Sequence, residues 1–263
     1  MRIDSIIFIR YLKLILSFVI LFLLYHAAEY MILFENDVTG FFIFQTLFFV
    51  AAFALGNWYS KEGLAAWGLH FSAKLFKPLF IGILSGIVIY AIPYYLSLAI
   101  GIETIIKVPG LSEIVKTSLP FIFGVLFSSF SEDILTRGLI YKHFNHKLKP
   151  LYLILLSATV YLLNHIYRLT SGPETILYLF LLGIIFVIPL MQTNRLWFTG
   201  GMHWAGNSFF FVSHNAIQME SNNNGLSPNY LFAICLAVFI PAIWFLLKHY
   251  SSAVSGNSSK TQC

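Results

Sequence analysis

The sequence predicts an all-α membrane protein, a single polytopic bundle of about eight transmembrane helices. Hydrophobic residues make up 58% of the 263 residues and charged residues only 10%, whereas about a quarter of the residues of an average soluble domain are charged. Eight apolar stretches each approach the length of about 20 residues that a helix needs to cross a bilayer. They are residues 12–34, 40–57, 78–100, 119–141, 151–167, 174–192, 196–214 and 229–247.

The basic residues predict the orientation of this bundle. If the N-terminus is cytoplasmic, twelve of the sixteen lysines and arginines fall in inside segments and three in outside segments, and Arg137 lies within the fourth stretch. Because basic loops stay in the cytoplasm, we expect both termini inside. We interpret the net charge of +5 as a topology signal and expect no nucleic-acid partner, since no basic patch with interleaved aromatic residues lies outside these short loops.

Two further segments outside the apolar stretches carry a prediction. The transmembrane bundle should occupy residues 1–250, and residues 251–263 should form a disordered cytoplasmic tail. Between the second and third stretches, apolar residues recur at helical spacing while the lysines fall elsewhere, which predicts a helix lying in the membrane interface. These apolar residues are Leu64, Trp67, Phe71 and Leu75.

The fourth stretch carries charges that lipid does not tolerate. Glu132, Asp133 and Arg137 lie in an otherwise apolar segment, and a charge in hydrocarbon costs several kcal/mol unless it is paired. On a helix Asp133 and Arg137 are four residues apart and able to pair. Glu132 lies about 100° round the helix, so it is left free for another partner. A free buried carboxylate suits a general base.

Two later stretches place polar pairs on one helix face. Tyr161 and His165 are four residues apart in the fifth stretch, and His203 and Asn207 are four residues apart in the seventh. We expect these faces to converge with that of Glu132. A carboxylate with a histidine can polarise a water, and a histidine with an amide can donate hydrogen bonds to an oxyanion. The nearby glycines allow either close helix approach or a broken helix; they are Gly200, Gly201 and Gly206.

In this order the three motifs, E-D-x-x-x-R, Y-x-x-x-H and H-x-x-x-N, resemble those of the CPBP (CAAX protease and bacteriocin-processing, Abi) family of intramembrane proteases. The resemblance covers a catalytic core of about residues 76–211. It implies that Glu132 and His165 activate the attacking water, and that His203 and Asn207 stabilise the tetrahedral intermediate. Arg137 would hold the carboxylate pair. Two positions depart from the family pattern, because Asp133 replaces a second glutamate and Tyr161 replaces a phenylalanine.

The resemblance also implies partners and a location. The expected substrate is a peptide or a membrane protein, with or without a lipid attached, and the protein should lie among the lipids of a bacterial plasma membrane. No cofactor is expected. Zinc is a less favoured alternative, because Glu132, His165 and His203 are possible ligands from three helices, although the sequence lacks an H-E-x-x-H pair.

Two other functions stay open from the sequence. A non-proteolytic membrane scaffold or immunity protein of the same family would carry the same motifs. A proton-coupled transporter would also place acids and histidines within the membrane. The transporter is less favoured, since no inverted halves are visible and the charged residues cluster in the fourth to seventh stretches.

Overall fold

The computed structural model describes the backbone of residues 2–222 and 225–258 and the side chains of residues 8–222 and 225–248. The described chain is almost entirely helical and contains one two-stranded sheet, which confirms the predicted all-α class. The elements are α1 (Arg2–Leu33), α2 (Val38–Ser60), α3 (Phe76–Ala99), β1 (Glu103–Lys107), α4 (Leu111–Asp133), α5 (Leu139–Phe144), α6 (Pro150–Asn164), α7 (Pro173–Thr193), α8 (Leu196–Phe211), β2 (Gln218–Ser221) and α9 (Pro228–Ser258).

Helices cover all eight apolar stretches. Within the described chain, six helical segments are long and apolar enough to cross a membrane, so the protein is an integral, multi-pass membrane protein. One of them joins α4, a π-helical turn (Ile134–Gly138) and α5 into a single rod. Helix α6 is apolar but has 15 residues, and α8 has 16. The number of eight crossings and the cytoplasmic termini therefore stay predictions.

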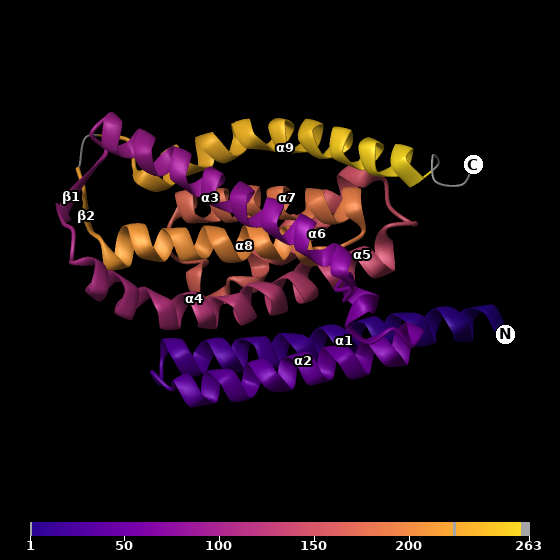
Figure 1. Cartoon of the computed structure of the whole chain (residues 1–263). Coiled ribbons are helices and arrows are strands. Elements are labelled where there is room, and N and C mark those ends of the chain that lie inside the picture. The colour runs from indigo at the N-terminus through magenta and orange to yellow at the C-terminus, as the bar shows by residue number, and fades with distance from the viewer. Residues whose placement is uncertain (1, 223–224, 259–263) are drawn as a thin grey trace.

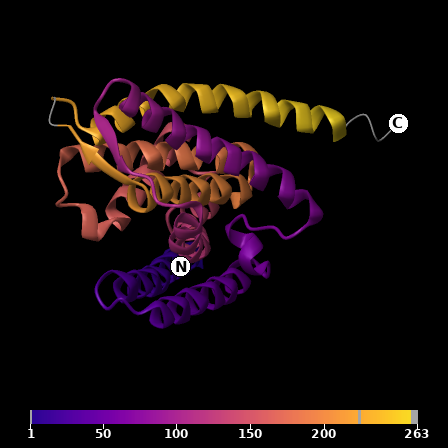
Figure 2. The same cartoon turned by 60° about the vertical axis from the view of Figure 1, so that its left-hand side comes forward.

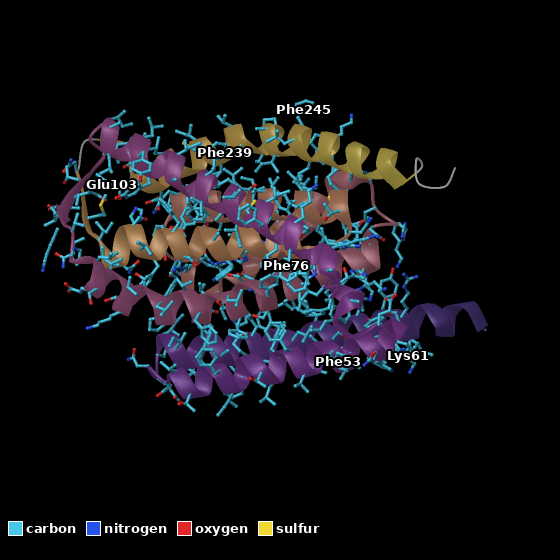
Figure 3. The ribbon with its side chains drawn as sticks, viewed as in Figure 1. Phe53, Lys61, Phe76, Glu103, Phe239 and Phe245 are labelled. Carbon is cyan, nitrogen blue, oxygen red and sulfur yellow. The ribbon has the colours of Figure 1, made fainter. Side chains whose placement is uncertain are left out.

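The helices lie side by side as a bundle with two distinct ends (Figure 1). Helices α1 and α2 form a hairpin along one side, α3 and α9 lie on the other, and α8 runs between α3 and α4 (Figures 1 and 2). Figure 3 shows Lys61 and Glu103 at opposite ends of the bundle. The rings of Phe53 and Phe245 are 53% and 61% exposed, as expected of side chains that face lipid.

Glycines bring α3 and α8 into backbone contact. A Cβ atom on Gly82 would lie 2.1 Å from the carbonyl oxygen of Phe198, and one on Gly86 would lie 2.2 Å from that of Met202. On the facing helix, a Cβ on Gly201 would lie 2.6 Å from the carbonyl oxygen of Leu79. Of the two alternatives for the glycines of α8, close approach is the one found. A break at this point is wrong, because the helix runs unbroken from Leu196 to Phe211.

The predicted interface helix between α2 and α3 is also wrong. This segment forms two short 3-10 turns, Gly63–Trp67 and Ala73–Leu75. Gly68 adopts a φ of 100° and ends the first turn, and its carbonyl oxygen accepts a hydrogen bond from the backbone N–H of Leu196. Trp67 points inward, is 1% exposed, and donates from Nε1 to the Ala52 carbonyl oxygen at 2.7 Å. A buried tryptophan N–H usually finds an acceptor, and the Ala52 carbonyl supplies it here.

The β1–β2 ladder joins two loops that the sequence did not predict to pair. The strands are antiparallel, with Glu103 opposite Ser221. Behind the ladder, Glu103 accepts a hydrogen bond from Ser97 at 2.6 Å and lies 3.5 Å from His214 Nε2. Burial acts to raise the pKa of Glu103, but the interactions with His214 and Ser97 outweigh it, so the pKa lies below its usual value.

The C-terminal helix extends into the expected tail. Helix α9 continues to Ser258, and the disorder expected from residue 251 stays a prediction. The segment after Lys248 contains no proline that would end a helix. The last part of the predicted tail, residues 259–263, lies outside the described residues.

Candidate active site

The two carboxylates stand at the end of α4, where the helix changes its winding. Glu132 and Asp133 are 4% and 0% exposed, and the π-helical turn follows directly. Thr136 Oγ1 donates to the Glu132 carbonyl oxygen at 2.8 Å, and Ser157 Oγ donates to the Thr136 carbonyl oxygen at 3.0 Å. These hydroxyls supply hydrogen bonds to carbonyls next to the widened turn. Single π-helical turns inside α-helices are frequent at functional sites.

Glu132 lies between two histidines that come from other helices. Its Oε1 atom is 3.6 Å from His165 Nδ1, and its Oε2 atom is 3.6 Å from His203 Nε2. Asn164 Nδ2 donates a hydrogen bond to Oε1 at 3.2 Å. Side chains from α4, α8 and the end of α6 therefore converge on one carboxylate, as the sequence predicted.

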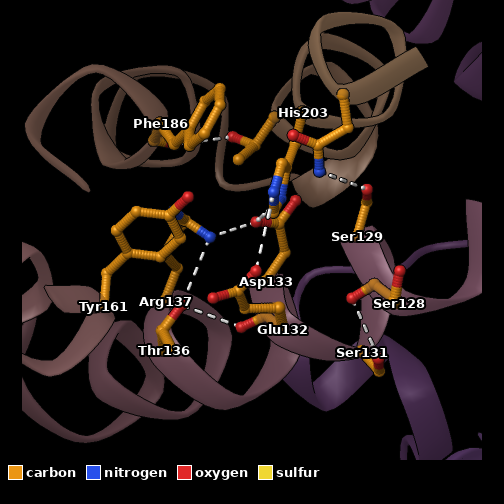
Figure 4. A network of polar contacts seen from close by, with 12 residues as sticks. Ser128, Ser129, Ser131, Glu132, Asp133, Thr136, Arg137, Tyr161, Phe186 and His203 are labelled. Atoms are coloured by element: carbon orange, nitrogen blue, oxygen red, sulfur yellow. Dashed lines mark hydrogen bonds and ion pairs between the residues drawn. The ribbon is translucent and has the colours of Figure 1, made fainter. Parts of the chain in front are cut away.

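Asp133 takes the partner that the sequence predicted and one more. It accepts a hydrogen bond from Arg137 Nη1, and His203 Nδ1 lies 3.1 Å from the same oxygen (Figure 4). Arg137 is 0% exposed, and its guanidinium carbon lies 4.3 Å from the centroid of the Tyr161 ring and 4.9 Å from that of Phe186. Aromatic faces stabilise a desolvated cation, so Tyr161 and Phe186 stabilise the guanidinium of Arg137 within the bundle.

His203 bridges the two carboxylates through its two ring nitrogens. Asp133 accepts only, so Nδ1 of His203 carries the proton of that contact. The opposite nitrogen, Nε2, then faces Glu132. A carboxylate that fixes the tautomer and orientation of a histidine is a recurrent arrangement in catalytic sites.

His165 reaches the site from just beyond a helix end. Helix α6 ends at Asn164, and His165 has φ −85° and ψ 51°. The prediction that Tyr161 and His165 share one continuous helix is wrong by this single residue. Nδ1 of His165 nevertheless lies 2.9 Å from the Tyr161 carbonyl oxygen, and the centroids of the His165 and Tyr161 rings are 4.6 Å apart. Because the carbonyl can only accept, Nδ1 is the protonated nitrogen and Nε2 is left as the acceptor.

Asn207 lies one turn beyond His203 on α8. Its Nδ2 atom is 3.5 Å from Ser129 Oγ of α4, which is a long hydrogen bond. The amide is partly buried and not committed to a strong partner. Figure 4 shows Ser129 on the same rod as Glu132 and Asp133.

Some contacts of this cluster were missed from the sequence. Asn164 precedes His165 directly, and an amide within a membrane segment needs a partner, so this residue carried a signal. Tyr25 of α1 is buried and lies close enough to Glu132 to interact with its charge, and nothing in the sequence singles it out among the tyrosines. The π-helical turn also has no sequence signature.

The expectation that the site holds no metal stays a prediction. Among the described residues, no group of three or more histidine, cysteine, aspartate and glutamate side chains has the arrangement of a metal site. The His165 nitrogen that faces Glu132 is the protonated one, since it also meets the Tyr161 carbonyl oxygen. Nε2 of this histidine keeps a lone pair, and a histidine that ligates a metal commonly donates its other ring N–H to a backbone carbonyl, so His165 could serve as a ligand through Nε2.

Comparison with protein families gives one match. Residues 114–209 match the family described as type II CAAX prenyl endopeptidase Rce1-like. No curated protein matched the chain. The matched segment runs from α4 to α8 and contains every residue of the three motifs, from Glu132 to Asn207. The resemblance drawn from those motifs is thereby confirmed: residues 114–209 are similar to the Rce1-like peptidases, in agreement with the CPBP family.

Proposed function

We propose that this protein is an intramembrane endopeptidase that hydrolyses a peptide bond with a water activated by Glu132 and His165. The observation that carries the proposal is the single carboxylate of Glu132 between two histidines, each 3.6 Å from a different carboxylate oxygen. A family of CAAX-type peptidases supplies the reaction class. Its description favours a peptide or a prenylated protein as the substrate.

Glu132 is the general base of the proposed reaction. It takes a proton from the water as the water oxygen attacks the carbonyl carbon of the scissile bond. His165 lies 3.6 Å from the same carboxylate and holds it in place for this step. When the carbon–nitrogen bond breaks, Glu132 returns the proton to the leaving nitrogen, so that a carboxylic acid and an amine are the products. A proton then passes from the acid to the amine and leaves a carboxylate and an ammonium. No metal takes part in this scheme.

His203 and Asn207 are the proposed donors to the oxyanion. Both side chains lie on one face of α8, and the amide of Asn207 has only a long contact to give up. Asp133 holds His203 by Nδ1, and Arg137 holds Asp133. In this role the His203 imidazole carries a proton on Nε2 as well as on Nδ1. The resulting Nε2–H is a donor for the developing oxyanion.

The decisive experiment uses Glu132→Gln, which removes the base and leaves almost the same shape. The purified protein in proteoliposomes is given internally quenched peptides that end in a farnesylated Cys-aliphatic-aliphatic-X sequence, together with their unprenylated counterparts. We expect cleavage by the wild type and a loss of at least about 100-fold in Glu132→Gln. Glu113→Gln is the matched control, because Glu113 is an exposed acid on the same helix. Cleavage that survives in purified Glu132→Gln would remove Glu132 from the mechanism.

A further inference from the structure

Asn164 is the buried amide closest to the proposed base. It is the last residue of α6 and is 3% exposed. Its Nδ2 atom donates to Glu132 Oε1 at 3.2 Å. Its Oδ1 atom is fully buried and has no hydrogen-bond partner among the described residues. One half of this amide is therefore committed to Glu132, and the other half is an acceptor directly beside it.

The orientation of the amide follows from the charge of its neighbour. An ionised carboxylate only accepts hydrogen bonds, so Asn164 must turn its NH2 group toward Glu132 and its oxygen away. Helix α6 ends at Asn164, and the side chain of this last residue contacts Glu132. His203 serves the other carboxylate oxygen. Asn164 and His165 thus form the Oε1 side of the site.

A water held by a general base needs an acceptor for its second O–H. One O–H points to the carboxylate that removes the proton. If the other O–H is fixed as well, a lone pair of the water oxygen is aimed in one direction. The unpartnered Oδ1 of Asn164 is an acceptor next to Glu132, and a buried acceptor gains most from such a donor because bulk water cannot supply one.

Building on the proposed function, we propose that Asn164 is a positioning residue for the hydrolysis. Its Nδ2 holds the Glu132 carboxylate, and its Oδ1 accepts a hydrogen bond from the water that Glu132 activates. This role lies outside the E-D-x-x-x-R, Y-x-x-x-H and H-x-x-x-N patterns, in which the residue before His165 is unspecified.

The first test replaces the amide with an apolar side chain of similar shape. Asn164→Leu should lower kcat for the quenched peptides about 100-fold, the effect of losing one preorganised hydrogen-bonding group, and should leave KM within about twofold. Gln45→Leu is the matched control, since Gln45 on α2 is also a buried amide with an unpartnered oxygen. We expect the control to keep wild-type kcat. An unchanged kcat in Asn164→Leu overturns the proposal.

A second variant separates positioning from mere packing. Asn164→Asp keeps the shape and the acceptor but replaces the donor to Glu132 with a charge that repels it. On acidification the new carboxyl gains a proton and can donate again. The activity of Asn164→Asp relative to the wild type should therefore rise as the pH falls. A constant ratio across the pH range would contradict a role through the hydrogen bond to Glu132.

A third measurement needs no substrate. An apolar carbodiimide modifies carboxyl groups in their protonated form, and mass spectrometry locates the adduct. Loss of the donor in Asn164→Leu should speed modification of Glu132 about tenfold at pH 7, as expected for a hydrogen bond to a charged group. Equal rates in wild type and Asn164→Leu would show that Asn164 does not hold Glu132, whatever the peptides show. If the wild type cleaves no peptide, the proposed function fails on that result alone, and this rate still decides the interaction.

Discussion

Removing the buried guanidinium of Arg137 should destabilise the protein far more than removing its catalytic carboxylate. In Arg137→Ala, Asp133 keeps His203 but loses its permanent cation. Breaking one partner of a buried ion pair costs about 3–5 kcal/mol. The stacked contacts of Arg137 with Tyr161 and Phe186 are lost as well, and cation–π contacts are worth about 2 kcal/mol when desolvated. Because these terms overlap, we expect a loss of about 4 kcal/mol in total.

The loss should be visible as a shift in the apparent melting temperature in detergent. For a chain of this size, 1 kcal/mol corresponds to about 2–4 °C, which gives a decrease of about 8–16 °C. Arg168→Ala is the control, since Arg168 is exposed in the loop after α6. Glu132→Gln should melt close to the wild type. If Arg137→Ala melts within about 2 °C of Arg168→Ala, the structural role given to Arg137 is refuted.

A double substitution checks the cause of the loss. Replacing both charges, as in Asp133→Leu with Arg137→Met, leaves no unpaired charge in the core. Exchange of a whole buried pair for apolar residues is often neutral, so the double variant should melt above Arg137→Ala. If the melting temperature of the double variant falls by the sum of the two single decreases, the two charges do not depend on each other.

Two remaining predictions concern the ends of the bundle. The first replaces His146 or Ser221, both exposed, by a single cysteine in a Cys235→Ser, Cys263→Ser background. The two cysteines should react with an impermeant maleimide from opposite faces of the membrane, position 146 from the inside. Labelling of position 146 from the outside would show that the topology is inverted. The lowered pKa of Glu103 means that its stabilising effect is present above the ordinary value of 4.5 and is lost as the pH falls through the lower folded value. Below about pH 4.5, the melting temperature of Glu103→Gln should therefore fall less than that of the wild type. Melting temperatures of the two proteins that fall in parallel with pH would contradict this.

The features that the sequence predicted well are those that the bilayer imposes. A charge in hydrocarbon must find a partner, so Asp133 with Arg137 and the convergence of Glu132 with His165 and His203 followed from residue types and spacing alone. The length of a membrane crossing likewise placed helices on all eight stretches. Hydrocarbon leaves few ways to satisfy the hydrogen bonds of polar groups, so the positions of polar residues in apolar stretches indicate which side chains must meet.

The features that the sequence missed depend on tertiary contacts. Trp67 fits the spacing of an amphipathic helix, but its indole N–H finds a buried acceptor in a carbonyl of α2. His165 lies four residues after Tyr161, and only the packed loop shows that the helix ends one residue earlier. The pairing of β1 with β2 joins positions more than a hundred residues apart, and local propensity carries no information about such contacts.

The Asp133–Arg137 pair lies within one helical rod, and this has a consequence for biosynthesis. The rod of α4 and α5 leaves the ribosome before α6 and α8 exist, so His165 and His203 cannot yet neutralise its charges. Arg137 is four residues from Asp133 and can pair with it from the start. Only Glu132 must then enter the membrane before its partners are made. A single carboxyl can do so in its protonated, uncharged form. Once His165 and His203 pack against it, Glu132 releases this proton, because the ionised carboxylate is the base of the proposed hydrolysis.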